Sequence, residues 1–220
     1  MRIGMLLFFI IAEGARAQMI GLPNARVTLA GTPTAPQIVN GSSHRILRYT
    51  LVEQGTSGAG RPRTYDMIRQ FINDPRAGIA PGATFSEAQL VHAETRDARG
   101  APPPPPIQVL LDSILFDNGV LVGPDKFNSY DAITAMLRAQ RDINQAVAAG
   151  NWSKLQQIAA AGGGDIGALS GSRMYERNYR LFVVSTAREL LTVRDRSSDA
   201  AAVKLAASLA SFPTISRGQQ

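Results

Sequence analysis

The chain has 220 residues, of which 45% are hydrophobic and 18% are charged. This composition is typical of a globular protein with a core of its own and excludes extensive disorder. Because the sequence contains no cysteine, disulfides, thiol catalysis and thiolate-bound metals are excluded as well. The formal net charge is +6. Residues 18–125 hold nine basic and nine acidic residues, whereas residues 126–220 hold twelve basic and seven acidic ones.

The first 17 residues have the pattern of a secretory signal peptide. Arg2 precedes an apolar stretch over residues 3–12, and Ala15-Arg16-Ala17 supplies the small residues that signal peptidase requires. The apolar stretch is too short to span a bilayer. We therefore expect cleavage near Ala17, a periplasmic or extracellular location, and a mature chain without a transmembrane helix. The alternative is a buried N-terminal strand or helix.

Residues 18–125 contain short hydrophobic segments separated by turns rich in glycine, proline, asparagine and serine. The segment Tyr65–Ile72 fits either a short helix or a strand, and the five prolines at 102–106 predict a stiff polyproline II connector. Elsewhere, hydrophobic and β-branched residues that partly alternate with polar ones predict β-strands. These strands are expected over residues 26–30, 37–39, 44–52, 84–86 and 90–94.

The clearest local pattern is a hairpin at the end of this region. Hydrophobic residues dominate the segments 107–116 and 120–122. Between them, Asp117-Asn118-Gly119 consists of residues that tolerate the positive φ angles of a tight turn. We therefore predict two antiparallel strands that close the β region.

After Pro124 the hydrophobic spacing changes from two to about 3.6, which predicts helices. Ser198 is a suitable N-cap for the last of them. Four helices are expected, over residues 130–147, 151–161, 175–191 and 200–212. The predicted fold class is α+β. We expect an antiparallel β-sandwich domain over residues 18–125, a helical segment over residues 126–213 and a disordered tail over residues 214–220.

Three segments resemble parts of exported bacterial β-sandwich proteins: the turn and strand over residues 39–51, the proline-glycine turn over residues 80–85, and the hairpin over residues 111–125. The hairpin is similar to the closing hairpin of uncharacterised exported proteins of soil bacteria, in which a helical tail follows. The resemblance covers residues 37–150. It implies a sandwich of immunoglobulin or fibronectin-III character followed by helices, and it implies no activity and no functional residues.

Few residues are candidates for metal binding. His44 and His92 are the only histidines in the sequence. A metal site would need both, together with carboxylates such as Glu94 or Asp97. A second candidate is a group of three aspartates around the hairpin, whose carboxylates suit calcium binding or acid–base chemistry but whose spacing is not that of an EF-hand loop. They are Asp112, Asp117 and Asp125.

Two glycine-rich motifs give no site. Gly167–Gly171 contains a serine, but its glycines do not have the spacing of a nucleophile elbow. Gly162, Gly164 and Gly167 match the pattern of a dinucleotide-binding loop, but no strand is predicted before them. We therefore assign no catalytic residue, no cofactor and no metal ligand from the sequence.

A stripe of arginines is the candidate binding feature. Arg173, Arg177, Arg180 and Arg188 recur at helical spacing in the third predicted helix, so they lie toward one side of it. Such a stripe fits contact with a polyanion. The alternative is a solvated face on a helix whose tyrosines belong to the core.

Taken together, these patterns favour an exported, non-catalytic protein with a binding or structural role at the cell envelope. Its expected partner is an envelope protein or an anionic envelope polymer, which would contact the sheet edge or the basic helices; no nucleic acid is expected. One alternative is a small exported hydrolase with a site between the sheet and the helices, in which His44 or His92 lies beside a serine or a carboxylate. Another is an inhibitor or chaperone-like module for an exported enzyme.

Overall fold

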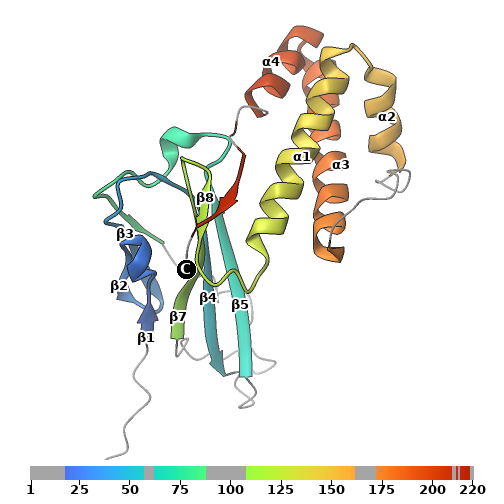
Figure 1. Ribbon diagram of the computed structural model, residues 1–220. Coiled ribbons are helices and arrows are strands. Elements are labelled where there is room, and N and C mark those ends of the chain that lie inside the picture. The colour runs from blue at the N-terminus through green and yellow to red at the C-terminus, as the bar shows by residue number, and fades with distance from the viewer. Residues whose placement is uncertain are drawn as a thin grey trace, which may run out of the picture.

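The computed structural model describes residues 18–56, 62–87, 108–161, 172–209, 212 and 214–218. Within this part of the chain the fold is mixed α+β, as predicted, with strands in the first half and four helices after them (Figure 1). The strands are β1 (Gln18–Ile20), β2 (Val27–Thr32), β3 (Ala35–Asn40), β4 (Ile46–Thr56), β5 (Pro62–Gln70), β6 (Thr84–Ser86), β7 (Gln108–Phe116), β8 (Val120–Val122) and β9 (Ser216–Arg217). The helices are α1 (Ser129–Ala148), α2 (Trp152–Ala161), α3 (Arg173–Arg196) and α4 (Asp199–Leu209), and two short 3-10 turns are η1 (Pro23–Ala25) and η2 (Pro75–Ala77).

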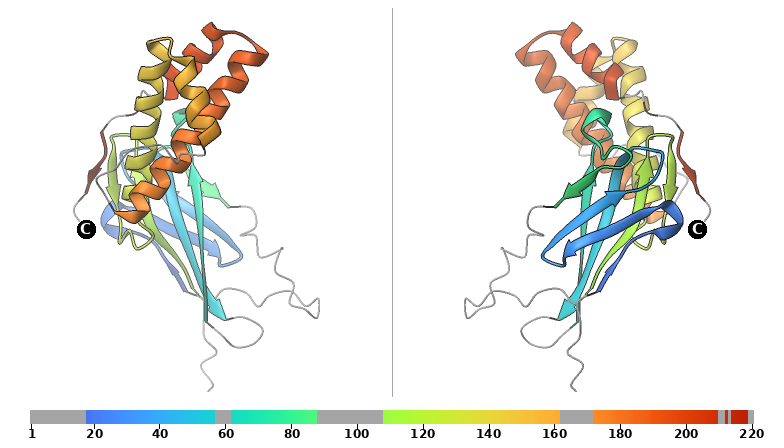
Figure 2. Two further views of the ribbon diagram at one scale, coloured as in Figure 1. Left: turned by 90° about the vertical axis from the view of Figure 1, so that its right-hand side faces the viewer. Right: turned by 90° about the vertical axis from the view of Figure 1, so that its left-hand side faces the viewer.

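The strands form two sheets packed as a sandwich (Figure 2). One sheet is antiparallel and has the order β2-β3-β6. The other has the order β5-β4-β7-β8-β9, and β1 pairs with β7 off this path. The chain passes between the two sheets after β1, β3, β5 and β6, as chains do in sandwiches of immunoglobulin or fibronectin-III type. The predicted sandwich is therefore confirmed.

The two sheets meet in an apolar core. Val27 and Ile38 of the smaller sheet pack with Tyr49, Leu51 and Leu111 of the larger one, and all five residues are buried. Burial of large apolar side chains is the dominant favourable contribution to such a layer, at about 25 cal/mol per Å² removed from water.

Helix α1 covers the other face of the larger sheet and makes a third layer. Leu47, Leu115 and Leu121 of the sheet form one buried cluster with Ile133 and Met136 of α1. A further cluster joins the four helices to one another. Because the first cluster draws side chains from both halves, the sandwich and the helices share packing across the boundary expected after residue 125.

The closing hairpin forms where the sequence predicts it. Gly119 has a φ of 82°, which a residue with a side chain rarely adopts, and the side-chain oxygen of Asn118 accepts a hydrogen bond of 3.0 Å from the amide of Val120. Asp117-Asn118-Gly119 therefore makes the turn between β7 and β8, as expected.

Strand pairing decides the conformation of the ambiguous segment, and a side-chain hydrogen bond confirms the predicted N-cap of α4. The ambiguous segment at residues 65–72 lies mostly in strand β5, because β4 pairs with it from Arg48 opposite Gln70 to Thr56 opposite Pro62. The hydroxyl of Ser198 accepts a hydrogen bond of 3.1 Å from the amide of Ala201, which confirms the predicted N-cap of α4.

The two terminal strands differ from the sequence-based expectation. Residues 214–218 are not a disordered tail: β9 pairs in parallel with β8, and the amide of Gly218 donates to the carbonyl of Leu121 at 2.7 Å. At the other end of the chain, β1 pairs in parallel with the start of β7. Strands of two and three residues carry too few positions to show a periodic pattern.

Several predictions lie outside the described residues. They concern the signal peptide at residues 1–17, the strand at residues 90–94, the proline run at residues 102–106 and the glycine-rich segment at residues 162–171. Within the part of the chain that is described, no helix has the apolar length that crossing a membrane requires.

Candidate functional site

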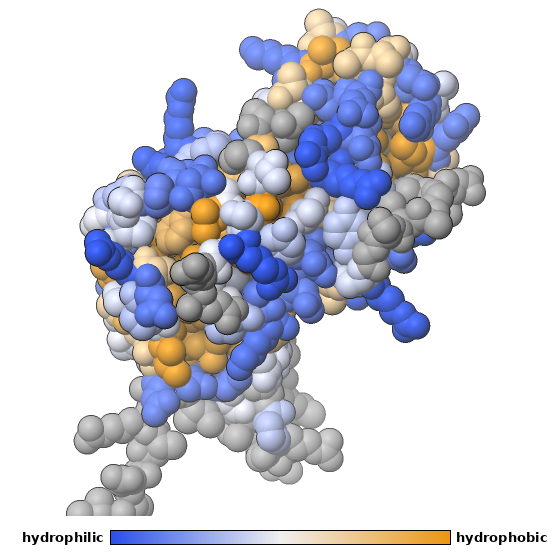
Figure 3. All heavy atoms as spheres, viewed as in Figure 1, coloured by the Kyte–Doolittle hydropathy of each residue, from blue (hydrophilic) through white to orange (hydrophobic). Residues whose placement is uncertain are grey.

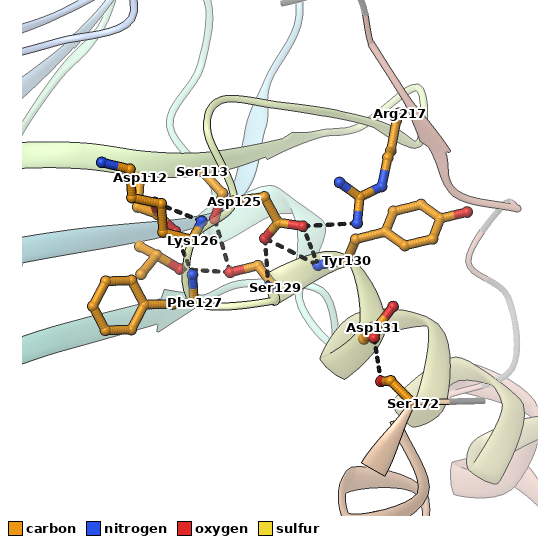
Figure 4. A network of polar contacts seen from close by, with 11 residues as sticks. Asp112, Ser113, Asp125, Lys126, Phe127, Ser129, Tyr130, Asp131, Ser172 and Arg217 are labelled. Atoms are coloured by element: carbon orange, nitrogen blue, oxygen red, sulfur yellow. Dashed lines mark hydrogen bonds and ion pairs between the residues drawn. The ribbon is translucent and has the colours of Figure 1, made fainter. Parts of the chain in front are cut away.

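Buried hydroxyl groups fasten the start of α1 to the larger sheet (Figure 4). The side-chain oxygens of Thr50 on β4 and Ser113 on β7 lie 3.0 and 2.8 Å from the hydroxyl oxygen of Ser129, the first residue of α1. All three residues are buried. The hydrolase alternative expects a site between the sheet and the helices, and at this point the space is filled by side chains that satisfy one another.

We call this junction of β4, β7 and the start of α1 the joint. Two of the three aspartates singled out in the sequence belong to it, and their carboxylates accept hydrogen bonds from backbone amides. Asp112 accepts from the amides of Lys126 and Phe127 at 2.9 and 3.2 Å. Asp125 accepts from the amides of Ser129 and Tyr130. These bonds fix the connection between β8 and α1 and satisfy amides at the start of the helix. Among the described residues, no group of three or more residues suited to binding a metal ion occurs.

Arg217 ties the C-terminal strand to the same joint. Its guanidinium nitrogen lies 3.2 Å from a carboxylate oxygen of Asp125, and the guanidinium carbon lies 4.5 Å from the ring centroid of Tyr130. Burial raises the pKa of Asp125, while the amide hydrogen bonds and the charge of Arg217 oppose that rise. The side chain of Arg217 itself is half-exposed.

Arg48 is a buried cation in the sheet beside this joint. Only 4% of it is exposed, and one of its terminal nitrogens donates to the side-chain oxygen of Gln70 at 2.8 Å. Its Nε has no hydrogen-bond partner among the described residues. Burial lowers the pKa of Arg48 to about 10, and the charge of Asp125 opposes the shift. The joint thus contains a buried positive charge on Arg48 and a buried negative charge on Asp125, and water screens neither of them.

His44 pairs with the third aspartate, away from the joint. Its Nδ1 lies 3.4 Å from a carboxylate oxygen of Asp117 in the hairpin turn. An imidazole beside a carboxylate is part of a hydrolase triad, but the neighbouring Ser42 does not complete it, because its hydroxyl is hydrogen-bonded to Asn40 and to the backbone of His44. His92 lies outside the described residues, so the two-histidine metal site stays a prediction.

A second charged cluster links the two sheets. The carboxylate of Glu87, which is 2% exposed, accepts two hydrogen bonds from Arg69 at 2.8 and 3.0 Å and one from the hydroxyl of Tyr49. Burial raises the pKa of Glu87, but the bonds from Arg69 and Tyr49 outweigh burial, so the pKa lies below its ordinary value. Glu87 therefore fastens the residue after β6 to strands β4 and β5.

The predicted arginine stripe lines one groove along α3. The groove has a volume of about 790 Å³, and all four predicted arginines contribute to its walls. Arg173, Arg177 and Arg188 are exposed, and Arg180 is half-buried. One acidic side chain, Glu176, lies among the described residues of the lining. The helical spacing read from the sequence thus places these cations together, as expected.

Apolar side chains share the groove with the arginines. Leu181 and Val184 line it as well, and Leu181 is 57% exposed. Figure 3 shows hydrophilic and hydrophobic residues interleaved over the helical part of the molecule. This apolar component was not predicted from the sequence, because leucine and valine on an amphipathic helix are usually core residues.

Contacts with α1 and α2 hold α3 in place, and one of them is made by an arginine of the groove. The hydroxyl of Tyr179 donates to the carboxylate of Asp142 on α1 at 2.6 Å, and the guanidinium of Arg188 donates to the carbonyl of Ala159 on α2 at 3.0 Å. Ser172 caps the helix by accepting from the amide of Tyr175 at 3.1 Å. The arginines therefore project from a helix with a fixed position.

A second cavity, of about 560 Å³, lies between α1, α2 and α3. Asp142, Lys154 and Tyr179 contribute its polar side, and Ile143 and Val183 contribute its apolar floor. Asp142 is already hydrogen-bonded to Tyr179 and lies 3.7 Å from Arg138. Asp142 and Tyr179 thus serve a contact between α1 and α3, and the α3 groove with its four arginines is the candidate binding site.

Comparison with known proteins assigns no relative to the chain. No family model, no curated protein and no solved structure matches it. The resemblance to exported bacterial sandwich proteins therefore stays a prediction.

Proposed function

We propose that this protein is a non-catalytic binding module of the cell envelope, which holds an anionic component of the envelope in the groove along α3. The observation that carries the proposal is the convergence of Arg173, Arg177, Arg180 and Arg188 on one groove. A guanidinium stays charged at any physiological pH and matches phosphate, sulfate or carboxylate with two parallel hydrogen bonds. A row of them is suited to a repeating anion rather than to a single small one.

The charge distribution supports this assignment. The +5 excess of basic residues after residue 125 belongs to the helical half, whereas residues 18–125 are neutral. A partner with extended negative charge is therefore steered toward the helices and away from the sandwich. Such an interaction weakens as salt increases.

Two features support export. The first is the signal-peptide pattern of residues 1–17. The second is that the pairing of Gln18–Ile20 with Gln108–Leu110 lies within the mature chain expected after cleavage at Ala17. Export is tested by N-terminal sequencing of the protein recovered from the periplasm. The expected first residue is Gln18, and a chain that still begins at Met1 would contradict export.

Binding is tested with long-chain inorganic polyphosphate as a soluble polyanion, in a salt titration followed by fluorescence anisotropy. We expect binding that weakens with salt. The double variant Arg173→Glu/Arg177→Glu should lose at least about tenfold in affinity, because two exposed cations of the groove become anions.

The matched control is Arg141→Glu/Lys204→Glu, which changes the net charge equally at exposed positions outside the groove lining. It should bind polyphosphate like the unchanged protein. Equal weakening in both double variants would mean that the whole positive charge attracts the anion and that the groove is not a site. No binding by the unchanged protein would also contradict the proposal.

A further inference from the structure

The apolar side chains of the α3 groove carry information about its ligand. Leu181 is 57% exposed, and Met174, two turns earlier on the same side of α3, is 39% exposed. Val184 adds an apolar wall one turn beyond Leu181. Arg177 lies between Met174 and Leu181 along the helix, and Arg188 follows one turn after Val184. The exposed side of α3 is therefore both cationic and apolar.

This mixture discriminates between classes of anionic partner. A soluble polyanion offers charges and hydroxyl groups, and it would leave Leu181 and Met174 facing water. A phospholipid surface offers phosphates at one depth and acyl chains just below them, so it covers both kinds of side chain. Arginine suits that boundary, because its aliphatic stem packs among apolar groups while its guanidinium remains at the phosphate level.

We propose that the anionic component held by α3 is the surface of a phospholipid bilayer. The arginines contact headgroup phosphates, and Leu181 and Met174 enter the boundary between headgroups and acyl chains. This inference rests on the proposed function, since it uses the same groove, and it adds the chemical class of the partner.

The contacts of α3 with its neighbours fit this role. Tyr179, Val183 and Leu190 are buried in the cluster that joins the helices. They hold one side of a 24-residue helix, about 36 Å long, against α1 and α2. Figures 1 and 2 show the helices gathered at one end of the molecule, with the sandwich extending from the other. The helix can therefore lie along a membrane surface without rearrangement of the sandwich.

The test is vesicle co-sedimentation of the purified protein. Two vesicle compositions are compared, phosphatidylcholine alone and phosphatidylcholine mixed with phosphatidylglycerol, and polyphosphate binding is measured in parallel. The unchanged protein should bind the anionic vesicles. Met174→Ser/Leu181→Ser should bind them about tenfold more weakly and bind polyphosphate normally, because this change removes apolar burial and keeps the arginines.

Two further variants test whether the apolar side chains and the arginines of α3 act separately. Val203→Ser removes an apolar side chain of comparable exposure, 42%, from α4 and should bind vesicles like the unchanged protein. Arg173→Glu/Arg177→Glu should lose both vesicles and polyphosphate, with about a 30-fold loss or more on vesicles.

Fluorescence measures directly whether position 181 enters the bilayer. Because the chain has no cysteine, Leu181→Cys supplies a single position for an environment-sensitive fluorophore, and Val203→Cys supplies its control. We expect a blue shift on anionic vesicles at position 181 and none at position 203.

The outcomes separate the two proposals. Arginine-dependent binding of polyphosphate without vesicle binding, or without a shift at position 181, would overturn the lipid inference and leave the proposed function standing. Vesicle binding that is unchanged in Met174→Ser/Leu181→Ser would do the same. Full binding of both ligands by Arg173→Glu/Arg177→Glu would overturn both proposals.

Discussion

The joint between the sheet and α1 and the groove on α3 both gather charged side chains, but they use them in opposite ways. In the joint, Arg48 and Asp125 are buried and held by partners within the chain. On α3, Arg173 and Arg177 are exposed beside a leucine that is itself mostly exposed. The contrast indicates that burial matters more than residue type. Buried charged side chains stabilise this fold, and exposed ones are available to bind a ligand.

The largest effect is expected from Asp125→Ala in the joint. The change leaves amides at the start of α1 without acceptors and removes a negative charge that favours the buried cation of Arg48. We expect the free energy of unfolding to fall by about 3 kcal/mol, measured by urea denaturation. The control Asp117→Ala, at a half-exposed position, should cost less than about 0.5 kcal/mol. Similar losses for the two variants would mean that burial does not decide which charges stabilise the fold.

A smaller effect, about 1.5 kcal/mol, is expected from Glu87→Gln, because Arg69 is half-exposed and partly screened by water. The folded-state pKa of Glu87 is lowered. Its contribution is therefore present at neutral pH and is lost as the pH falls through the ordinary glutamate range toward the folded-state pKa. Urea denaturation at several pH values should show that stability depends less on acid in the variant. An unchanged acid dependence would mean that Glu87 gains nothing from its partners.

Arg217→Ala tests the contact of the C-terminal strand and should cost about 1 kcal/mol or less, because the side chain of Arg217 is half-exposed. The change should act locally. Hydrogen exchange should accelerate at the amide of Gly218, which donates to Leu121, and should stay slow along the centre of β7. Faster exchange throughout the larger sheet would show instead that β9 is required for the whole sheet.

The smallest effect on stability is expected from Arg173→Glu/Arg177→Glu on α3. Both side chains are exposed, so the free energy of unfolding should change by less than about 0.5 kcal/mol while anion binding is lost. A loss of more than about 1 kcal/mol in urea denaturation would show that these arginines stabilise the fold, as the buried charges of the joint do.

Local patterns predicted the parts of the fold in which neighbouring residues decide the conformation. The turn at Asp117-Asn118-Gly119, the cap at Ser198 and the common face of the four arginines each follow from a few adjacent or helically spaced residues. These features depend on backbone geometry that the sequence specifies directly.

The burial of sheet residues beneath α1, which forms a third layer, was not predicted from the sequence. The alternation in β4 placed Arg48 and Thr50 on a polar face, yet α1 covers that face and both residues are buried. Their burial depends on a helix about eighty residues later in the chain, so no local pattern contains it. The apolar wall of the α3 groove was missed for a related reason, because only the packing shows that Leu181 lies outside the helical core.

The position of β9 has a consequence for how the protein is made. Ser216 and Arg217 leave the ribosome or an export channel long after β8 and Asp125. Until they arrive, β8 presents unpaired amides and carbonyls of the kind that recruit strands from other chains. A chain truncated shortly before Ser216 would keep the residues of its sandwich core. It would also leave the edge of β8 unpaired and able to pair with strands of other chains. Proteases and chaperones that recognise open edges would thus distinguish chains that contain β9 from chains that lack it.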